Sequence, residues 1–458
     1  METTQTTAET QSAEKNKLLR ILGIGFGLAV VVGGMIGVGI LRTPGIVAAN
    51  VGSVWLILAV WVFGGIYTLI AANSYAELGT MLPKAGGPYV FAQRTYGAFG
   101  GFVIGWSDWF LNTCATAYLA VAASEYCAAL FPALADFVPL VAVAILLFFS
   151  VLHWFGVRAG SGAQKLTSLL KVVFFFVLIA ACFIFGERQN LAEFGQTSKS
   201  LFANPMTAFV AVILSLQAVV ETYAGYNSVV YFSEENTNPS RNIPRSLFGG
   251  VLTVTAIYLL VNLALLYVLP VSTIADSKLP AADAASSVFG ETGGTIITVL
   301  SLVSLLSIVN AIIMQTPRTL FAMSRDGLFS IRAATVNKGG TPAIALILTV
   351  LLAIVLAASG TFESLFAITA FMGVTVDCSV FLALLVLRKT EPDLPRPFKA
   401  RGYPALPLFI LIFSVLLLIA YVISNTMNSL FALTIMALSY PIFLIVRTLN
   451  KKREAGSF

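Results

Sequence analysis

Four glycines fall within seven residues of the first long apolar segment, in the run Gly33-Gly34-Met35-Ile36-Gly37-Val38-Gly39. Each glycine in a helix interior costs about 1 kcal/mol relative to alanine, so the run weakens a helix in its middle. In a membrane, peptide groups released from a helix persist only where protein covers them or where they line a cavity. The run therefore predicts a broken helix and a binding site for a small polar solute at the break.

A second interruption lies in the sixth apolar segment, where Tyr223-Ala224-Gly225-Tyr226-Asn227-Ser228 is polar and contains a glycine. A broken helix exposes unpaired N–H groups at the start of its second half and unpaired carbonyls at the end of its first half. The N–H end attracts a carboxylate, and the carbonyl end attracts an ammonium group. Two facing breaks therefore suit a zwitterion, with N–H groups of residues 36–39 on its carboxylate and carbonyls near 32–34 and 221–223 on its amine.

The residues at the two breaks are the predicted substrate-binding residues. They are Met35, Ile36, Gly37, Val38 and Gly39 at the first break, and Glu221, Tyr223, Ala224, Gly225 and Tyr226 at the second. The alternative is that the glycines only allow neighbouring helices to pack closely, as small residues do in membranes. That alternative explains a single break more easily than two breaks at matched positions.

The composition identifies the elements that must position these residues. The chain has 458 residues, of which 58% are hydrophobic and 10% charged, whereas soluble domains carry about 25% charged residues. These values predict an all-α membrane protein, and the net charge of +6 requires no nucleic acid partner. Twelve apolar segments are long enough to cross a bilayer, at 20–48, 53–76, 99–131, 137–155, 166–186, 206–232, 246–269, 295–323, 342–359, 364–387, 404–424 and 428–447.

The distribution of charge predicts the orientation. With the N-terminus inside, most Lys and Arg residues, Arg318 among them, fall in inner loops and tails, and only Arg42, Arg188, Lys199 and Lys278 fall in outer segments. Inner loops of membrane proteins carry such an excess of positive charge. Both termini are therefore expected in the cytoplasm, with the polar residues 1–16 as a disordered tail.

The positions of the breaks also predict the domain organisation. Interruptions in helices one and six are expected if residues 17–186 and 187–390 are two inverted five-helix repeats. Residues 391–458 then hold helices 11 and 12 and a cytoplasmic C-terminal tail. The outer loop at about 270–294 is long enough for a short helix over the outer face.

Several motifs together resemble one transporter family. The run Gly33-Gly34-Met35-Ile36-Gly37-Val38-Gly39-Ile40 resembles the first-helix motif of the amino acid–polyamine–organocation (APC) superfamily. Further matches are Gly86-Gly87-Pro88-Tyr89-Val90-Phe91, the second break with the following Glu234-Glu235 and Arg241-Asn242-Ile243-Pro244-Arg245, and Met323-Ser324-Arg325-Asp326-Gly327. The resemblance spans residues 20 to about 390 and is to bacterial relatives of the L-type and cationic amino acid transporters.

The resemblance implies a leucine-transporter-type fold that works by alternating access, with discontinuous helices 1 and 6 holding the substrate. It also implies that Glu234, Glu235, Arg241, Arg325 and Asp326 help to close the cytoplasmic side. The alternative for these charges is a solvated inner face. The family's heterodimeric members bind a helper subunit through an outer cysteine between helices 3 and 4, and the loop at 132–136 has none. No obligatory helper subunit is therefore expected.

Lys171 is a single charge within the fifth apolar segment. From its position alone, it could extend its side chain to the inner membrane surface. The preceding Gly156-Val157-Arg158 pattern, with Gly160 and Gln164, resembles the fifth helix of sodium-independent members, where a lysine replaces a bound sodium ion. The resemblance implies that its ammonium reaches carbonyls of helix 1 and a hydroxyl of helix 8, for which Ser307 is the candidate.

Glu221 departs from the family pattern, because relatives commonly place an aromatic residue just before the second break. Three interpretations are open: it binds a cationic group of the substrate, it carries a proton, or it pairs with a polar neighbour. Asp108 and Asp377 are further carboxylates within apolar segments and either join a proton path or hydrogen-bond a neighbouring helix. His153, the single histidine, is expected at the membrane interface.

The sequence thus predicts a secondary amino acid transporter of a bacterial cytoplasmic membrane, sodium-independent, and either proton-coupled or an exchanger. The alternatives are a polyamine or cationic amine transporter, a sodium-coupled symporter of the same fold, and, from a different class, a channel. A channel needs a continuous pore lining, and the sequence has two isolated breaks instead. No cofactor or metal site is implied, and without a nucleophile–base or metal-ligand grouping an enzyme is not expected.

Overall fold

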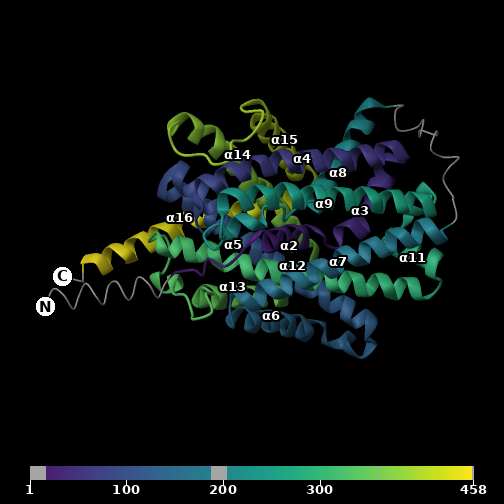
Figure 1. Ribbon diagram of the computed structural model, residues 1–458, viewed down its shortest axis with the longest axis horizontal. Helices are drawn as coiled ribbons and strands as arrows, with labels where there is room; N and C mark the ends of the chain where they lie inside the picture. The colour runs from purple at the N-terminus through teal and green to yellow at the C-terminus, as the bar shows by residue number, and fades with distance from the viewer. Residues whose placement is uncertain (1–16, 187–203, 360–361, 456–458) are drawn as a thin grey trace.

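The structure is a computed structural model that describes residues 17–186, 204–359 and 362–455. These residues form helices and two isolated β-bridges, and they contain no β-strand. Figure 1 shows most of the helices lying side by side along the longest axis of the molecule. The expected all-α architecture is confirmed.

The α-helices lie in chain order and are separated by short 3₁₀-helices and loops. They are α2 (Ile24–Met35), α3 (Gly39–Val51), α4 (Val54–Met81), α5 (Pro88–Leu130), α6 (Val138–Trp154), α7 (Val157–Phe185), α8 (Pro205–Thr222), α9 (Pro239–Val268), α10 (Val271–Asp276), α11 (Pro280–Phe289), α12 (Thr292–Arg325), α13 (Ala343–Ser359), α14 (Phe362–Thr390), α15 (Ala405–Ser424) and α16 (Thr426–Ala455). The 3₁₀-helices are η1 (Pro132–Phe137), η4 (Ser228–Phe232) and η5 (Ile331–Ala334).

Among the described residues, eight helical spans are long and apolar enough to cross a membrane. The pair α2 and α3, bent by 44° at its break, gives a ninth if it is taken as one span. α8 and α13 contain shorter apolar helices. Each of the twelve predicted segments contains a helix. The helix order is compatible with twelve membrane crossings and two inverted repeats, and both stay predictions.

Two helix starts depend on special residues. The side chain of Asn204 accepts a hydrogen bond from the backbone N–H of Met206, and Pro205 occupies the first position of α8, where its missing N–H is not needed. α5 begins at Pro88, before the predicted segment, and Gly97 interrupts it with a φ of 74°, which favours glycine. The stretch before Gly97 lies in the loop region that the sequence analysis placed outside the membrane.

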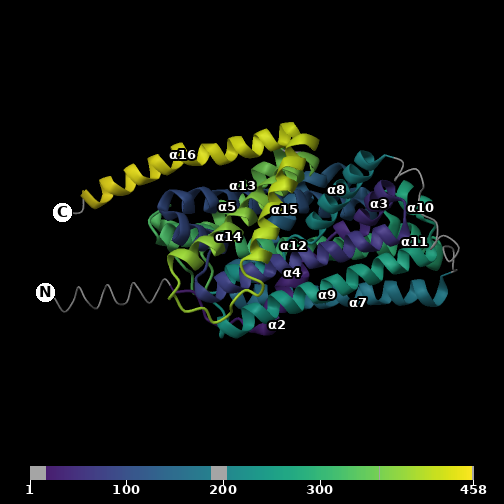
Figure 2. The same cartoon turned by 90° about the horizontal axis from the view of Figure 1, so that it is seen from above.

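The helices differ in how deeply they lie in the bundle. The apolar part of α12 is mostly buried, and α12 packs against α5, α7 and α2. α6, α15 and α16 are mostly exposed and present large apolar side chains outward, among them Phe148, Leu140 and Ile423. Figure 2 shows α16 along the outer edge of the molecule. An apolar outer surface of this size suits contact with lipid.

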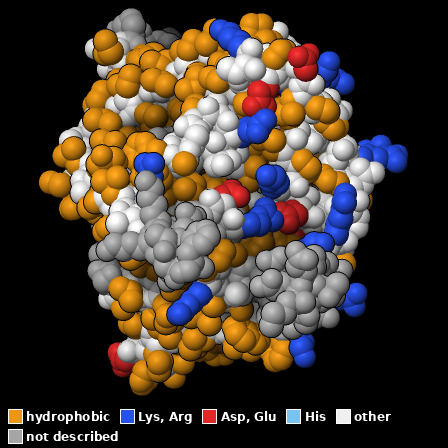
Figure 3. Space-filling model, turned by 90° about the vertical axis from the view of Figure 1, so that its left-hand side faces the viewer, with side chains coloured by type: hydrophobic (Ala, Val, Ile, Leu, Met, Phe, Trp, Pro, Cys, Tyr) orange, Lys and Arg blue, Asp and Glu red, His pale blue; other side chains and the backbone are white. Residues whose placement is uncertain are grey.

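The two ends of the bundle are different. Figures 1 and 2 show both chain termini at one end, here called the terminal side, and α10 and α11 at the other, here called the distal side. α10 and α11 lie in the loop predicted to hold a short helix, so that prediction is confirmed. Figure 3 views the terminal side and shows Lys and Arg side chains spread over this face.

Candidate functional site

The first predicted break is present between α2 and α3. α2 ends at Met35, Ile36 is extended with φ −74° and ψ 103°, and α3 begins at Gly39. Of the N–H groups predicted for a carboxylate, that of Ile36 instead donates to the carbonyl of Val32 at 3.0 Å, so the prediction was wrong for this residue. The backbone N–H groups of Gly37, Val38 and Gly39 donate no hydrogen bond to any described residue. Three adjacent N–H groups at the start of a helix form a site of positive potential for an anion.

The second predicted break follows α8. The helix ends at Thr222, the N–H of Tyr223 turns back to the carbonyls of Val219 and Val220, and the chain resumes as the short 3₁₀-helix η4. Gly225 lies in this turn with a φ of 89°, a conformation that side chains disfavour. The sixth predicted segment is therefore an α-helix, a turn and a 3₁₀-helix in sequence.

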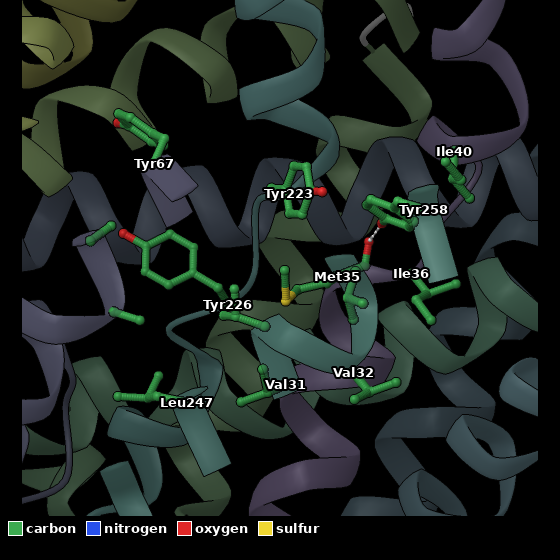
Figure 4. Close-up of a cluster of buried hydrophobic side chains, with 14 of the residues drawn as sticks. Val31, Val32, Met35, Ile36, Ile40, Tyr67, Tyr223, Tyr226, Leu247 and Tyr258 are labelled. Carbon is green, nitrogen blue, oxygen red and sulfur yellow. Dashed lines mark hydrogen bonds between the residues drawn. The ribbon is translucent and has the colours of Figure 1, made fainter. Parts of the chain in front are cut away.

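The two breaks contact each other directly. A Cβ atom added to Gly225 would lie 2.7 Å from the carbonyl oxygen of Gly34, so only glycine allows this approach. The hydroxyl of Tyr258, on α9, donates to the carbonyl of Met35 at 2.8 Å and lies 3.1 Å from the carbonyl of Thr222. Figure 4 shows Tyr258 joined to Met35, with Tyr223 and Tyr226 beside them. α9 thereby holds the ends of α2 and α8 together.

A cavity of about 1040 Å³ lies against both breaks. Of the predicted substrate-binding residues, all except Ile36 and Tyr223 line it. Its other walls are α4, α5, α12, α14 and α15, and its lining reaches Ile46, Tyr126 and Asn425 near the distal ends of their helices. Among the described residues, the lining includes none of the predicted cytoplasmic-gate residues. The cavity therefore extends toward the distal side and is closed from the terminal side.

Asp108 and Asp377 line the cavity, and each is held by tyrosine. Asp108, on α5, accepts hydrogen bonds from Tyr231 at 2.5 Å and Thr319 at 2.9 Å. Asp377, on α14, accepts from Tyr75 at 2.5 Å and Tyr226 at 3.1 Å. Both carboxyl groups thus hydrogen-bond neighbouring helices, which was one of the two expectations. Whether either carries a proton stays a prediction.

Glu221 is the carboxylate that differs from these two. It lines the cavity on the last turn of α8, one residue before the helix ends. Its side chain makes no hydrogen bond or ion pair with any residue that the structure describes, so the structural interpretation, in which Glu221 pairs with a polar neighbour, has no partner among them.

Lys171, on α7, is fully buried against the first break. Its ammonium donates to the carbonyl of Gly33 at 2.7 Å and to that of Ile36 at 2.6 Å, which are carbonyls of the first helix as expected. The predicted partner Ser307 lies next to this site, because a Cβ on Gly33 would be 3.3 Å from its hydroxyl oxygen. The Ser307 hydroxyl pairs with that of Thr167 at 3.0 Å. Lys171 therefore does not extend to the membrane surface.

Two ion pairs lie on the terminal side, beyond the lining of the cavity. Arg325 donates to Glu234 at 2.8 Å, and Glu234 also accepts the N–H of Ala85 at 3.0 Å. Arg318, buried under the ring of Phe232, forms a forked ion pair with Glu235, with one bond at 2.8 Å. Both loop glutamates therefore bind the last turns of α12.

The other two predicted gate residues have different surroundings. The phenol of Tyr89 donates to Asp326 at 2.9 Å, and burial together with the Asp326 carboxylate raises the pKa of Tyr89, so the phenol stays a donor. Arg241 is exposed at the start of α9, and its side chain pairs with none of the described residues. Its place in a gate stays a prediction.

The segment before α2 also crosses this end of the molecule. Leu22 forms a parallel β-bridge with Asn236: its N–H donates to the carbonyl of Glu235 at 2.9 Å, and its carbonyl accepts the N–H of Thr237 at 2.9 Å. Arg20 donates to the carbonyl of Asn236 at 2.8 Å. We call residues 20–22 with residues 235–237 the clasp. The clasp ties the start of α2 to the loop that carries both gate glutamates.

Two buried polar residues were misplaced or missed in the sequence-based predictions, and a third has an unexpected partner. Arg318 was placed in an inner loop but is 2% exposed within α12. His153 is 2% exposed, with its ring 3.1 Å from the carbonyl of Asn310, and its place at the membrane interface stays a prediction. Glu77, which was not singled out, is fully buried and binds Arg388 and Arg396. An arginine inside an apolar run was the available signal for Arg318.

Comparison with known proteins gives consistent matches over nearly the whole chain. A family model described as amino acid permease matches residues 28–446. The serine/threonine exchanger SteT of Bacillus subtilis (strain 168) is 30% identical over 449 residues, which is 97% of this chain and 99% of that protein. The b(0,+)-type amino acid transporter 1 of Mus musculus is 29% identical, covering 89% and 84%. The large neutral amino acids transporter small subunit 2 of Mus musculus is 28% identical, covering 93% and 81%.

Proposed function

Because the chain belongs to the amino acid permease family, we propose that it is a secondary amino acid transporter that works by alternating access in a bacterial cytoplasmic membrane. The observation that carries this proposal is the first break. Three N–H groups, of Gly37, Val38 and Gly39, face a cavity without an acceptor among the described residues. Orphan donors at a helix start suit a carboxylate, which every amino acid carries.

The α-amine has a complementary place at the same break. The carbonyls of Val32, Gly33 and Met35 already accept hydrogen bonds, whereas those of Gly34 and Ala224 receive none from the described residues and belong to cavity-lining residues. Carbonyls near a helix end carry partial negative charge. An amino acid bound with its carboxylate at residues 37–39 and its amine at these carbonyls would satisfy both sets of peptide groups.

Transport without sodium follows from the position of Lys171. Its ammonium occupies the space between the carbonyls of Gly33 and Ile36, where a cation would otherwise be needed to offset two carbonyl dipoles. A fixed positive charge at this point makes a bound sodium ion unnecessary. Exchange is the favoured mode, since the relative SteT is named an exchanger, and proton coupling is the alternative.

The orientation and subunit composition are part of the same proposal. The terminal side, rich in Lys and Arg, would face the cytoplasm, as positive loops do. The structure then corresponds to an outward-facing state closed by the Glu234–Arg325 and Glu235–Arg318 pairs. One relative is named a small subunit, whereas the name of SteT mentions none. We propose that this chain works alone, because residues 132–136 offer no cysteine for a covalent helper.

The test is counterflow with the purified protein in liposomes. Liposomes are loaded with a mixture of unlabelled amino acids, and uptake of each labelled amino acid is measured in potassium and in sodium buffer. We expect saturable uptake that internal amino acid stimulates and that is equal in both buffers. Uptake that required sodium would contradict the role given to Lys171, and unsaturable flux without counterflow would indicate a channel.

A further inference from the structure

Resting on the proposed function, we propose that the substrate is an amino acid whose side chain ends in an ammonium or guanidinium group, and that Glu221 recognises that group. The cavity has an acidic lining: Asp108, Glu125, Glu221 and Asp377 contribute carboxylates, and Arg42 is the one basic side chain among the described lining residues. A cavity lined by one sign of charge concentrates ligands of the opposite sign.

Glu221 is distinguished from the neighbouring carboxylates by what it lacks. Asp108 and Asp377 each accept two hydroxyl hydrogen bonds, so the protein itself satisfies them. Glu221 accepts none from the described residues, although it lies on the wall of the cavity. A carboxylate held in a membrane-spanning helix without a protein partner is unfavourable unless water or a ligand supplies the partner.

The position of Glu221 on its helix adds to this need for a cation. The carboxylate lies on the last turn of α8, where the helix dipole places partial negative charge. Carboxylates are favoured at helix starts and disfavoured at helix ends, so the peptide groups of α8 oppose the charge of Glu221. A cationic group in the cavity would interact favourably with both the side chain and the helix end.

The surroundings of Glu221 fit an organic cation. Tyr421 lies on α15, and the ring of Phe366 packs on Tyr118 with centroids 5.7 Å apart. All three aromatic residues line the cavity. Ring faces attract ammonium and guanidinium groups. Gln217, one turn earlier on α8, also lines the cavity, and its buried amide nitrogen has no partner among the residues that the structure describes. The wall therefore holds a further polar group for a ligand.

The position of Glu221 relative to the breaks indicates which charged groups the ligand carries. Its neighbour Thr222 hydrogen-bonds Thr43 at 2.8 Å, and a Cβ on Gly39 would lie 3.0 Å from the Thr222 methyl group. The end of α8 therefore lies against the start of α3, where the unpaired N–H groups are. With the carboxylate at these N–H groups and the α-amine at the carbonyls of Gly34 and Ala224, a ligand that also contacts Glu221 carries a second positive group.

The experiment is competition in counterflow by the full-length protein in liposomes. Uptake of a labelled amino acid is measured in the presence of unlabelled competitors. These are the cationic amino acids arginine, lysine and ornithine, the neutral amino acids leucine and serine, and the decarboxylated amines agmatine and cadaverine. The variants are Glu221→Gln, Glu221→Asp and the control Asp136→Asn, which removes an exposed carboxylate beyond the end of α5. Expected are preference for the cationic amino acids in the unmodified protein and a fall of about 10- to 100-fold in the cationic-to-neutral affinity ratio in Glu221→Gln. Asp136→Asn should keep the ratio, and Glu221→Asp should retain part of it.

The outcomes separate the two proposals. Uptake of neutral amino acids that a hundredfold excess of arginine or lysine does not inhibit would overturn the role of Glu221 and leave amino acid transport standing. An unchanged ratio in Glu221→Gln would also overturn it. If Glu221→Gln is inactive, the competition profiles of the unmodified protein and of Glu221→Asp decide whether Glu221 recognises the cationic group. Stronger competition by agmatine or cadaverine than by arginine or lysine would refute the carboxylate site, and with it the proposed function, while supporting recognition of the cation.

Discussion

The cavity at the helix breaks and the cluster of ion pairs on the terminal side are both rich in polar groups. They differ in whether the protein itself supplies hydrogen-bond or charge partners for those groups. At the breaks, the N–H groups of residues 37–39 and the carboxylate of Glu221 have no partner among the described residues. On the terminal side, Glu234 and Glu235 are both bound by arginine. Unsatisfied groups mark a place that a ligand completes, whereas satisfied groups mark a closed contact. The same contrast separates the proposed binding site from the proposed gate.

The largest expected effect comes from breaking the buried half of the terminal cluster. Glu235→Gln leaves the guanidinium of Arg318 buried without its counter-ion, which should destabilise the closed state by about 3–5 kcal/mol. A lowered melting temperature of the detergent-purified protein would report it. The double variant Glu235→Leu, Arg318→Met removes both charges and should recover part of the loss. A double variant that melts lower than Glu235→Gln would contradict this account.

Substitution of Lys171 tests the opposite region. Lys171→Ala removes two charge-assisted hydrogen bonds, to the carbonyls of Gly33 and Ile36, and should lower counterflow by about 100-fold. The control is Lys165→Ala, an exposed lysine on the same helix, which should transport normally. Lys171→Ala with normal uptake would mean that the break holds its shape without the ammonium.

A smaller effect is expected where the two breaks meet. Gly225→Ala places a side chain at a φ of 89° and a Cβ 2.7 Å from the Gly34 carbonyl oxygen, so the breaks must separate. The strain of about 1–2 kcal/mol should reduce apparent substrate affinity by about 10-fold. Gly162→Ala, at a helical glycine with open space around it, is the matched control. Equal affinities in the two variants would show that the contact between the breaks is not needed for binding.

The smallest effect is expected from the second ion pair of the cluster. Arg325 and Glu234 are partly exposed, and exposed pairs contribute about 0–1 kcal/mol. Arg325→Gln should therefore lower the melting temperature far less than Glu235→Gln, and high salt should reduce the difference from the unmodified protein. A loss as large as that of Glu235→Gln would place the strength of the closure in the exposed pair instead.

Much of the site could be predicted because its signals are local in the sequence. The clustered glycines of the first break, and the polar residues around Gly225 at the second, are each close together in the sequence, so both breaks were found at the correct residues. Lys171 is a charge inside an apolar run, and the resemblance supplied its carbonyl partners, which the structure contains. One short helix was expected from loop length where the structure has two, α10 and α11.

The residues that sequence reasoning missed have partners far along the chain. Arg318 pairs with Glu235 across 83 residues, and Glu77 binds Arg388 across 311 residues. Charge counting assigns an arginine near a segment end to a loop, because it carries no information on a buried counter-ion. The burial of His153 was not predicted for the same reason, because it depends on the packing of α12 against α6 and α7.

The clasp affects how the conformational change of this protein can be studied. A pair of main-chain hydrogen bonds at Leu22 would contribute to holding the proposed cytoplasmic gate closed, and replacing side chains one by one leaves such bonds in place. Alanine scanning would consequently underestimate the free-energy barrier between the outward-facing and the inward-facing state. A substitution by proline, which has no peptide N–H, would reveal how much these main-chain hydrogen bonds contribute to the stability of the closed state.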